Sequence, residues 1–560
     1  MVSARPRYRF QLLLVLLLPC SLLPGCLPGP SPATPSPSPT SASPSATLPT
    51  GGTPVSVLVQ QDLPVDALAY DLDVHLTPLS HRLEVTATVR LRWDPGMKEA
   101  TFWLDSRLKV DVAQVNGQPA STTMGQGWVS VPLLAESILV DETVVTLHYA
   151  GEIATPGVWW WPDHIEEGSV ALGQTTWYPR LNDFGQDFHT ATLMVWVPQT
   201  LTVIATGSPA GREETATEIG YRWHSDVPVS LLALVAGMYE SRSAESRGIV
   251  LTAYARPGHA QELPGILEQA QKILEVYQDA FTPYPHRHFK VAEVVTDARG
   301  AWGFPTLVML QAGGDGLASA VLPHEIAHQW WPGQVMPRGT GAIWLVEGLA
   351  TYCDLFYSTR PGYAQEGVER VIKFERAYLS HVKGSEEVSI AGYHSCTDSE
   401  EPSIYITYYK GALVFRMLEY LLGRETFARC LRTYAERYRF QSTDWRNFPS
   451  LCEEVSGQDL DWFFEQWLWT TKRLDYAVEK VEVREGTATV HIRRIGAAIM
   501  PLEVQVRFAD GSAETQRWDG QAEQGQVTFQ TRGRTADRVE LDPDHWLLDV
   551  DRGNNAASVS

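Results

Sequence analysis

The segment His324-Glu325-Ile326-Ala327-His328 is followed, 18 residues after its second histidine, by Glu347. Residues four apart on a helix lie on one face, so the two imidazoles can reach the same ion. Two histidines and one glutamate form a catalytic zinc set that leaves a fourth position open for water. Glu325 lies about a hundred degrees round the helix, where it can hold that water as a general base. The motif therefore predicts a zinc centre for hydrolysis.

The sequence on either side of this motif changes its periodicity twice. Apolar and polar residues alternate over residues 83–93 and again over 193–197 and 201–205, which indicates half-buried strands. From about Arg256 to Thr471 the apolar residues recur every three or four positions, which predicts amphipathic helices. Alternation returns after Val481, with Asp510-Gly511 as a hairpin-turn candidate. We therefore expect a multidomain α+β chain.

These changes set the expected domain boundaries. A β domain is predicted over residues 54–240, a mainly helical catalytic domain over 241–472, and a small β-sandwich over 473–553. The chain of 560 residues is long enough for three such units.

The first 53 residues predict export. Residues 1–26 combine three arginines with a short apolar run and end in Leu23-Pro24-Gly25-Cys26, which resembles a lipoprotein cleavage box with Cys26 lipidated. An ordinary cleaved signal peptide is the alternative. Residues 27–53 are rich in Pro, Ser and Thr and predict a solvated tether. We expect a protein on the outer face of the cell membrane, held through its N-terminal lipid only, or else a secreted one.

The net charge bears on nucleic-acid binding, and the cysteine content bears on disulfide bonds. The formal net charge is −21, and phosphate recognition needs a basic footprint, so nucleic-acid binding is not expected. Beyond the export segment the cysteines are Cys353, Cys396, Cys430 and Cys452. An exported protein permits disulfides between them, but buried free thiols are an equal alternative and the sequence does not choose a pairing.

The zinc motif, its spacing to Glu347 and the run from Trp344 to Tyr352 together resemble the membrane-alanyl-aminopeptidase family of gluzincin metallopeptidases. The resemblance implies a saddle-like N-terminal β domain, a thermolysin-like catalytic domain and a small β-sandwich. It also implies one Zn²⁺ per chain, held by His324, His328 and Glu347, with Glu325 as the general base and a peptide as the substrate.

A second motif lies downstream of the zinc segment. Tyr408-Tyr409-Lys410-Gly411 resembles the Tyr-Glu-Lys-Gly run in which the family places a catalytic tyrosine. The match assigns this role to Tyr408, whose phenol can donate a hydrogen bond to an oxyanion. Tyr409 replaces the glutamate of the family. The alternative is that Tyr408 and its neighbours are packing aromatics.

The substrate-binding motif departs from the family. Family members recognise a free α-amino group with the glutamate of a Gly-x-Met-Glu-Asn strand, whereas this chain has Gly300-Ala301-Trp302-Gly303-Phe304. Gly303, or Gly300 in a shifted register, stands where the glutamate should be. Gln174, before Trp177-Tyr178-Pro179, is similar to a family glutamine that contacts the substrate N-terminus. Asp354 resembles a family acid that could accept the outer N–H of a zinc-binding histidine.

The sequence thus predicts a zinc-dependent, aminopeptidase-like metallopeptidase that lacks the family's amine-binding glutamate. One alternative is a peptidase that acts on blocked or internal peptide bonds. The other is a non-catalytic cell-surface binding protein built on a peptidase scaffold, which the intact set of His324, Glu325, His328, Glu347 and Tyr408 disfavours.

Overall fold

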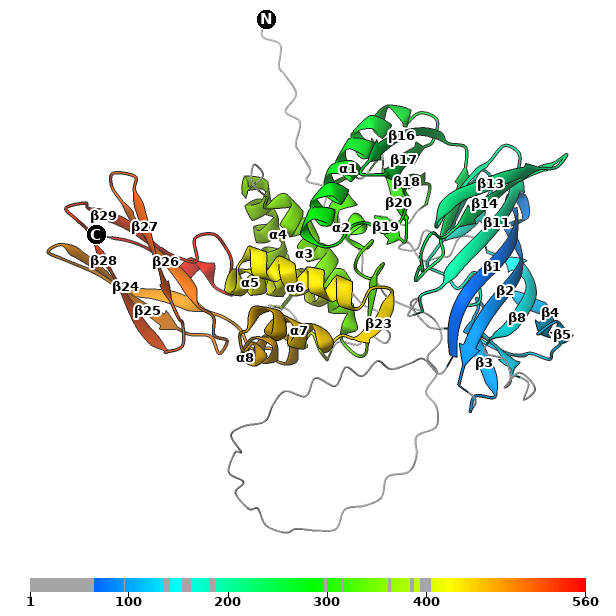
Figure 1. Ribbon diagram of the computed structural model, residues 1–560. Coiled ribbons are helices and arrows are strands. Elements are labelled where there is room, and N and C mark those ends of the chain that lie inside the picture. Colours follow the sequence, from blue (N-terminus) through cyan, green and yellow to red (C-terminus); the bar gives the residue numbers. More distant parts are fainter. Residues whose placement is uncertain are drawn as a thin grey trace, which may run out of the picture.

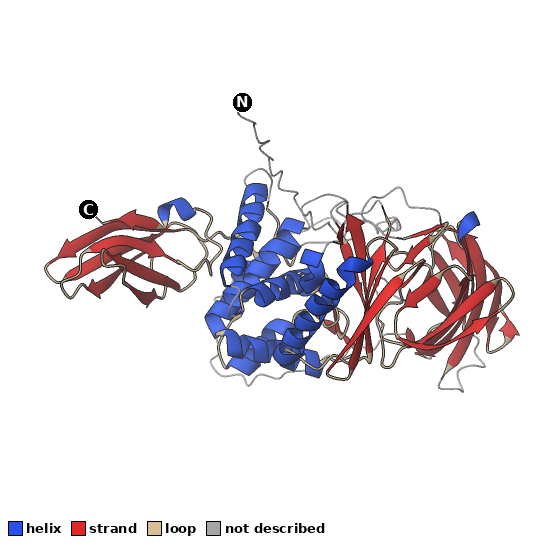
Figure 2. Cartoon of the chain, turned by 90° about the horizontal axis from the view of Figure 1, so that it is seen from above, coloured by secondary structure: helices blue, strands red, loops and turns tan. Residues whose placement is uncertain are grey.

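The computed structural model describes residues 65–559 apart from residue 95 and residues 134–141, 154–162, 182–186, 297–299, 314–315, 318, 361–363, 383–386 and 393–403. The predicted export segment, the tether, Cys26 and Cys396 lie outside the described residues. The chain forms a sheet-rich N-terminal part, a helical middle and a C-terminal group of strands, which lie in a row (Figures 1 and 2). This order agrees with the predicted α+β arrangement.

The N-terminal part is built around one large sheet with the strand order β13-β14-β11-β1-β2-β8-β4-β5. Its core strand β1 pairs with β2 in antiparallel and with β11 in parallel register, so Leu72 lies opposite both Ala87 and Leu193. The alternation read from the sequence places these apolar residues on the buried face. The strands are β1 (Val65–Thr77), β2 (Arg82–Trp93), β4 (Lys109–Val115), β5 (Gln118–Pro119), β8 (Thr143–Glu152), β11 (Thr190–Pro198), β13 (Ser208–Glu214) and β14 (Glu218–His224).

Two smaller sheets complete this part. They have the orders β12-β15-β10-β9 and β3-β7-β6, and they pack into the same apolar core. Their strands are β3 (Glu99–Trp103), β6 (Thr123–Gly125), β7 (Trp128–Pro132), β9 (His164–Glu166), β10 (Ser169–Leu172), β12 (Thr202–Ala205) and β15 (Leu234–Gly237).

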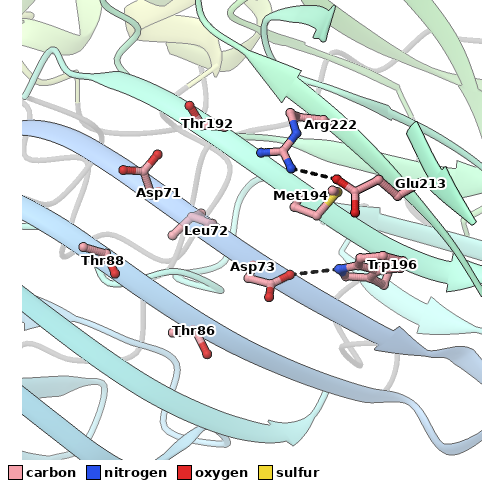
Figure 3. Close-up of a pocket in the computed structure, with 10 residues that line it drawn as sticks. All are labelled: Asp71, Leu72, Asp73, Thr86, Thr88, Thr192, Met194, Trp196, Glu213 and Arg222. Atoms are coloured by element: carbon pink, nitrogen blue, oxygen red, sulfur yellow. Dashed lines mark hydrogen bonds and ion pairs between the residues drawn. The ribbon is translucent and has the colours of Figure 1, made fainter. Parts of the chain in front are cut away.

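The exposed face of the large sheet carries a hollow of about 390 Å³ (Figure 3). Four of the residues that line it pair with one another: the Trp196 indole donates to Asp73 at 3.0 Å, and Arg222 pairs with Glu213 at 3.0 Å. The predicted site residues do not line this hollow, so it is separate from the predicted zinc centre.

The sheet of the predicted catalytic domain, called the catalytic sheet below, follows with the order β16-β17-β18-β20-β19. Val291 and Val308 on one face join the core beneath the helices, whereas Ala292 and Leu307 on the other face join the N-terminal core. Because both faces are covered, every residue of β18 after His288 is buried, including the charged Lys290 and Glu293. The strands are β16 (Glu240–Ser246), β17 (Ile249–Ala255), β18 (His288–Val294), β19 (Ala301–Phe304), β20 (Leu307–Gly313) and β21 (Gly316–Leu317).

Helices pack on the face of this sheet that carries Val291 and Val308, opposite the N-terminal part (Figure 1). They are α1 (Leu263–Ala280), α2 (Leu322–Ala327), α3 (Glu347–Ser358), α4 (Ala364–Val382), α5 (Gly411–Leu422), α6 (Arg424–Arg437), α7 (Asn447–Ser456) and α8 (Asp461–Phe464), with a π-helix η7 (Ile404–Lys410) leading into α5. Strands β22 (Val335–Arg338) and β23 (Gln441–Asp444) pair in parallel beside them. In the part of the chain that the structure describes, no helix has the length and apolar content needed to cross a membrane.

The C-terminal strands form two sheets, β24-β25-β28 and β27-β26-β29-β30. The predicted turn at Asp510-Gly511 joins β26 to β27, and Gly511 adopts a φ of +84° there. The strands are β24 (Tyr476–Arg484), β25 (Thr487–Arg494), β26 (Leu502–Phe508), β27 (Ala513–Trp518), β28 (Gln524–Gln530), β29 (Ala536–Leu541) and β30 (Ala556–Ser558).

Three of the four cysteines considered for disulfides are described. Cys353, Cys430 and Cys452 are buried free thiols, so the structure follows the thiol alternative for these positions.

Candidate metal centre

Two helical elements bring the three predicted ligands together. α2 carries His324 and ends at Ala327, and His328 continues the turn with right-handed helical angles. Glu347 is the first residue of α3. Its carboxylate oxygen lies 3.3 Å from Nε2 of His324 and 3.6 Å from Nε2 of His328. All three side chains are buried or nearly so, which keeps competing water away from the ligand atoms.

The spacing of these atoms fits zinc. Tetrahedral coordination with ligand distances of about 2.0–2.2 Å places neighbouring ligand atoms about 3.3–3.6 Å apart. The two separations from the Glu347 oxygen fall in this range. Two imidazole nitrogens and a carboxylate oxygen are also the donor types that zinc takes in hydrolytic sites.

The outer nitrogen of each histidine has a partner that fixes its tautomer. Nδ1 of His328 lies 2.7 Å from the carbonyl of Trp331 and donates to it, which leaves Nε2 to face the carboxylate of Glu347. Thr351 donates its hydroxyl to the carbonyl of Glu347 at 2.7 Å and can therefore accept from Nδ1 of His324 at 3.3 Å. Thr351 thus connects two ligands.

The sequence predicts that Asp354 accepts the outer N–H of a zinc-binding histidine. The structure pairs its carboxylate with Arg370 instead, and Thr351 takes the place beside His324. Asp354 still acts on His324 through its charge. Burial opposes protonation of His324, but the contact with Glu347 and the charges of Glu325 and Asp354 raise its pKa.

Glu325 lies beside the three ligands. Its carboxylate lies within 4.8 Å of the histidine nitrogens and is buried. Burial raises the pKa of Glu325 to about 8, with a further increase from Glu347 that His324 and the N–H of Gly303 oppose. A carboxylate whose pKa lies near neutrality suits proton transfer in both directions.

Tyr408 reaches the same centre from η7. Its ring stacks on His324 at 5.9 Å between centroids, and its hydroxyl hydrogen-bonds the carboxylate of Glu347. Burial alone would raise the pKa of Glu347, but the two imidazoles and this hydroxyl lower it. Tyr409 turns away and stacks on Phe374 at 4.8 Å. The π-helix therefore presents one tyrosine to the ligands and the next to the core.

Two glycines allow this approach. A Cβ at Gly348 would lie 2.6 Å from the carbonyl oxygen of Thr407 and 3.2 Å from Cα of Gly411. The helix that carries Glu347 and the π-helix that carries Tyr408 can come this close only because both contact positions lack a side chain. The sequence motifs contain both glycines, but their mutual contact is not visible in either motif alone.

The two faces of strand β19, which runs beside the candidate metal centre, pack against different cores. Ala301 packs toward the helical core, whereas Trp302 and Phe304 pack toward the N-terminal core. A Cβ at Gly303 would lie 2.5 Å from the carbonyl oxygen of Glu325 and 3.0 Å from Cβ of His328. The structure therefore leaves no room for a side chain at Gly303, and it turns the predicted contact residue Trp302 away from α2.

Gly300 and Gln174 are the other two predicted substrate-binding residues. Gly300 precedes β19 with a φ of +130°, and its N–H donates to Gln311 at 3.0 Å. Gln174 is half-buried in a loop whose N–H groups converge on Asp163. The adjacent Gly173 lies against Phe304, where a Cβ would come within 2.4 Å of the ring. The loop that carries Gln174 therefore contacts β19 through Phe304, on the face of the strand that packs toward the N-terminal core.

Comparison with known proteins agrees with this geometry. Residues 266–467 match the sequence profile of the Peptidase family M1 domain. Aminopeptidase M1-A of Oryza sativa subsp. japonica is 26% identical over 307 residues, which cover 51% of this chain and 34% of that protein. The chain spans about a third of the length of the curated relatives it matches.

Two solved structures share the fold. The M1 zinc metallopeptidase from Deinococcus radiodurans has a TM-score of 0.62 at 21% identity, over 73% of this chain and 95% of that one. A mutant of it has been crystallised with a Tyr-Ser-Ala substrate. Legionella pneumophila aminopeptidase A, in complex with aspartic acid, has a TM-score of 0.68 at 14% identity, over 88% of this chain and 60% of that one.

Proposed function

The middle of this chain belongs to the Peptidase M1 family, and from that premise we propose that the protein is a zinc-dependent, aminopeptidase-like peptide hydrolase. The observation that carries the proposal is the convergence of His324, His328 and Glu347 on one point, with Glu325 and Tyr408 beside them. Chance packing does not account for two oriented imidazoles, a buried base and a buried phenol at one centre.

The residues divide the chemistry between them. When bound, zinc supplies a Lewis acid that acidifies water and polarises the scissile carbonyl. Glu325 takes the proton of the attacking water and delivers it to the leaving amine. The N–H of Gly303 holds the Glu325 carboxylate toward the centre. Trp331 and Thr351 keep the histidines in the tautomers that present Nε2.

Tyr408 supports the developing negative charge. Its hydroxyl already points at the centre, where it donates to Glu347. In the transition state the same hydroxyl can donate to the oxyanion, and one such donor contributes about 3–4 kcal/mol. Because the ring is already stacked on His324, it does not have to be ordered again when the transition state forms.

The substrate binds beside β19 in this proposal. β19 lies at the edge of the catalytic sheet, and within the described ranges no strand covers its outer side. An extended peptide can therefore add to this edge through main-chain hydrogen bonds. Gly303 supplies no carboxylate for the substrate amine, and the close contact with α2 prevents any side chain there from doing so.

We propose that the free amino terminus of the substrate matters less here than in family members with the glutamate. Gln174 can offer one amide acceptor, which is weaker than a buried ion pair. A hydrolase of blocked or internal peptide bonds is therefore the second candidate, and the crowded backbone at Gly303 is the observation that favours it.

One assay separates the two candidates. The ratio of kcat/KM is measured for one peptide with a free and with an acetylated N-terminus, and Gln174→Ala is compared with the original chain. We expect a ratio below about a thousandfold, because a lost buried charge pair costs about 3–5 kcal/mol and no such pair forms here. A larger ratio that Gln174→Ala abolishes would restore a strict aminopeptidase.

The location of the protein is a further proposal. A lipid on Cys26, followed by the tether at 27–53, would hold the enzyme at the outer face of the cell membrane, with no other membrane contact. Metabolic labelling with a radioactive fatty acid tests this: label in the original chain and none in Cys26→Ser is expected. Label retained in Cys26→Ser, or none in either chain, would favour a secreted protein.

A further inference from the structure

The turn between β19 and β20 holds a residue in an unfavourable conformation. Thr306 has a φ of +64°, a region that β-branched residues rarely enter. Such a conformation costs about 1–3 kcal/mol and persists only where the surroundings fix it. Thr306 is completely buried, so the surroundings that fix it are protein groups.

Three parts of the chain hold this turn. Gln329, the residue after His328, accepts from the N–H of Thr306 at 2.8 Å and donates to the carbonyl of Phe304 at 2.9 Å. Gly207, from the N-terminal part, donates its N–H to the hydroxyl of Thr306 at 2.8 Å. Lys290 of β18 donates to the same hydroxyl at 3.0 Å and also to the carbonyl of Gly207.

Lys290 is the residue that joins these parts. Its side chain is 2% exposed, and its ammonium lies 4.9 Å above the ring of Trp223. The backbone N–H of Lys290 also donates to the carbonyl of Thr306 at 2.9 Å. Burial of an ammonium on two neutral oxygens is costly unless the contacts are well formed. The lysine therefore ties the N-terminal part, the turn and the catalytic sheet at a single point.

The turn lies directly beside the catalytic base. Gly303, three residues before Thr306, donates its N–H to Glu325 and packs against the backbone of α2. A displacement of the turn would carry Gly303 with it, because β19 spans only Ala301–Phe304. The position of Glu325 thus depends on contacts that lie outside α2.

We propose that Lys290 is a positioning residue for hydrolysis: through Thr306 it fixes the β19–β20 turn and so holds the Gly303 N–H against Glu325. This inference rests on the proposed peptidase activity. It also means that Gly207, in the N-terminal part, helps to position the base of the catalytic domain.

The test compares four variants. Lys290→Met keeps the length of the side chain without the ammonium, and Thr306→Val keeps the shape of Thr306 without the hydroxyl. Thr306→Ser keeps the hydroxyl and serves as the conservative variant. Arg416→Met is the matched control, because Arg416 is also a buried cation, 4% exposed, that donates to carbonyls of the C-terminal part, at His545 and Asp544.

We expect kcat to fall by about tenfold or more in Lys290→Met and Thr306→Val, since sub-ångström misplacement of a catalytic group has effects of this size. KM should change by less than about threefold, and bound zinc should stay at one per chain. The double variant should be no slower than the slower single variant, because both act through one contact. Thr306→Ser should keep kcat, and Arg416→Met should lower Tm without lowering kcat.

A second readout does not need turnover. Hydrogen exchange of the zinc-loaded chains should be faster at residues 301–307 in Lys290→Met than in the original chain or in Arg416→Met. If the original chain cleaves no peptide, the peptidase proposal fails, and exchange alone decides the positioning role. Unchanged exchange, or a kcat loss equal to that of Arg416→Met, would overturn the role of Lys290.

Discussion

Replacing Gly348 by alanine adds one methyl group at the contact between α3 and η7. That methyl carbon would lie 2.6 Å from the carbonyl oxygen of Thr407, about 0.8 Å inside the 3.4 Å at which ordinary contacts begin. The obstacle is backbone, so no side chain can rotate away. The π-helix must therefore move, and Tyr408 follows Thr407 directly in the chain.

The expected loss follows from this displacement. A shift of about 0.8 Å separates the Tyr408 hydroxyl from Glu347 and from the site of the oxyanion. Misplacement of a catalytic group by about 1 Å costs about a hundredfold in rate. We therefore expect kcat of Gly348→Ala to fall about 30- to 100-fold, equivalent to about 2–3 kcal/mol.

Steady-state kinetics on a chromogenic peptide, with metal analysis of each preparation, measures the effect. Tyr408→Phe in the Gly348→Ala background should cost less than the same change in the original chain, because the hydroxyl is already displaced. Gly265→Ala in α1 is the control: no atom lies within 4 Å of its new methyl, and the variant should gain about 0.5–1 kcal/mol of stability at unchanged kcat. Full activity in zinc-loaded Gly348→Ala would refute the argument that this contact positions Tyr408.

Four further outcomes are expected. Glu325→Gln should keep zinc but lose turnover, and activity within about tenfold of the original would mean that Glu325 is not the base. Tyr408→Phe should lose about two to three orders of magnitude in kcat while Tyr409→Phe, whose ring stacks on Phe374, loses little; the opposite ranking would move the role to Tyr409. Chelation should abolish activity and added zinc restore it, with one zinc per chain by metal analysis; an active metal-free chain would contradict the ligand assignment. Burial lowers the pKa of His189 to about 4, so below pH 6.5 the unfolded chain takes up a proton that the folded chain does not bind. Between pH 7 and 4.5 the free energy of unfolding, measured by urea denaturation, should therefore fall by about 2 kcal/mol more in the original chain than in His189→Gln, and equal losses would place His189 in contact with water.

The sequence predicted the order of sheets and helices because side-chain periodicity reports burial directly. The alternation along β1 and β2 and the three-to-four spacing along α1 both correspond to one buried face. The ligands of the candidate centre could also be predicted, since the spacing of His324, His328 and Glu347 is a local property of the chain. Each of these patterns depends only on residues near one another in sequence.

The contacts that orient the side chains of the centre could not be predicted from the sequence in the same way. Thr351 rather than Asp354 lies beside His324, because Arg370 from another helix takes the Asp354 carboxylate. Trp302 faces away from α2 because Gly303, which packs on α2, fixes the alternation of the strand. Both outcomes depend on residues far apart in the chain, which the motifs do not contain.

The catalytic sheet has two buried faces, and this has a consequence for how the chain can evolve. Its second face, with Val294, Leu307 and Met309, is part of the N-terminal core. A gene fragment that began at residue 241 would encode a sheet with that face bare, an apolar surface of the kind that aggregates. Recombination at the boundary between β15 and β16 would therefore be selected against, although the connection there is short. We therefore expect the two parts to be inherited and to fold as one unit.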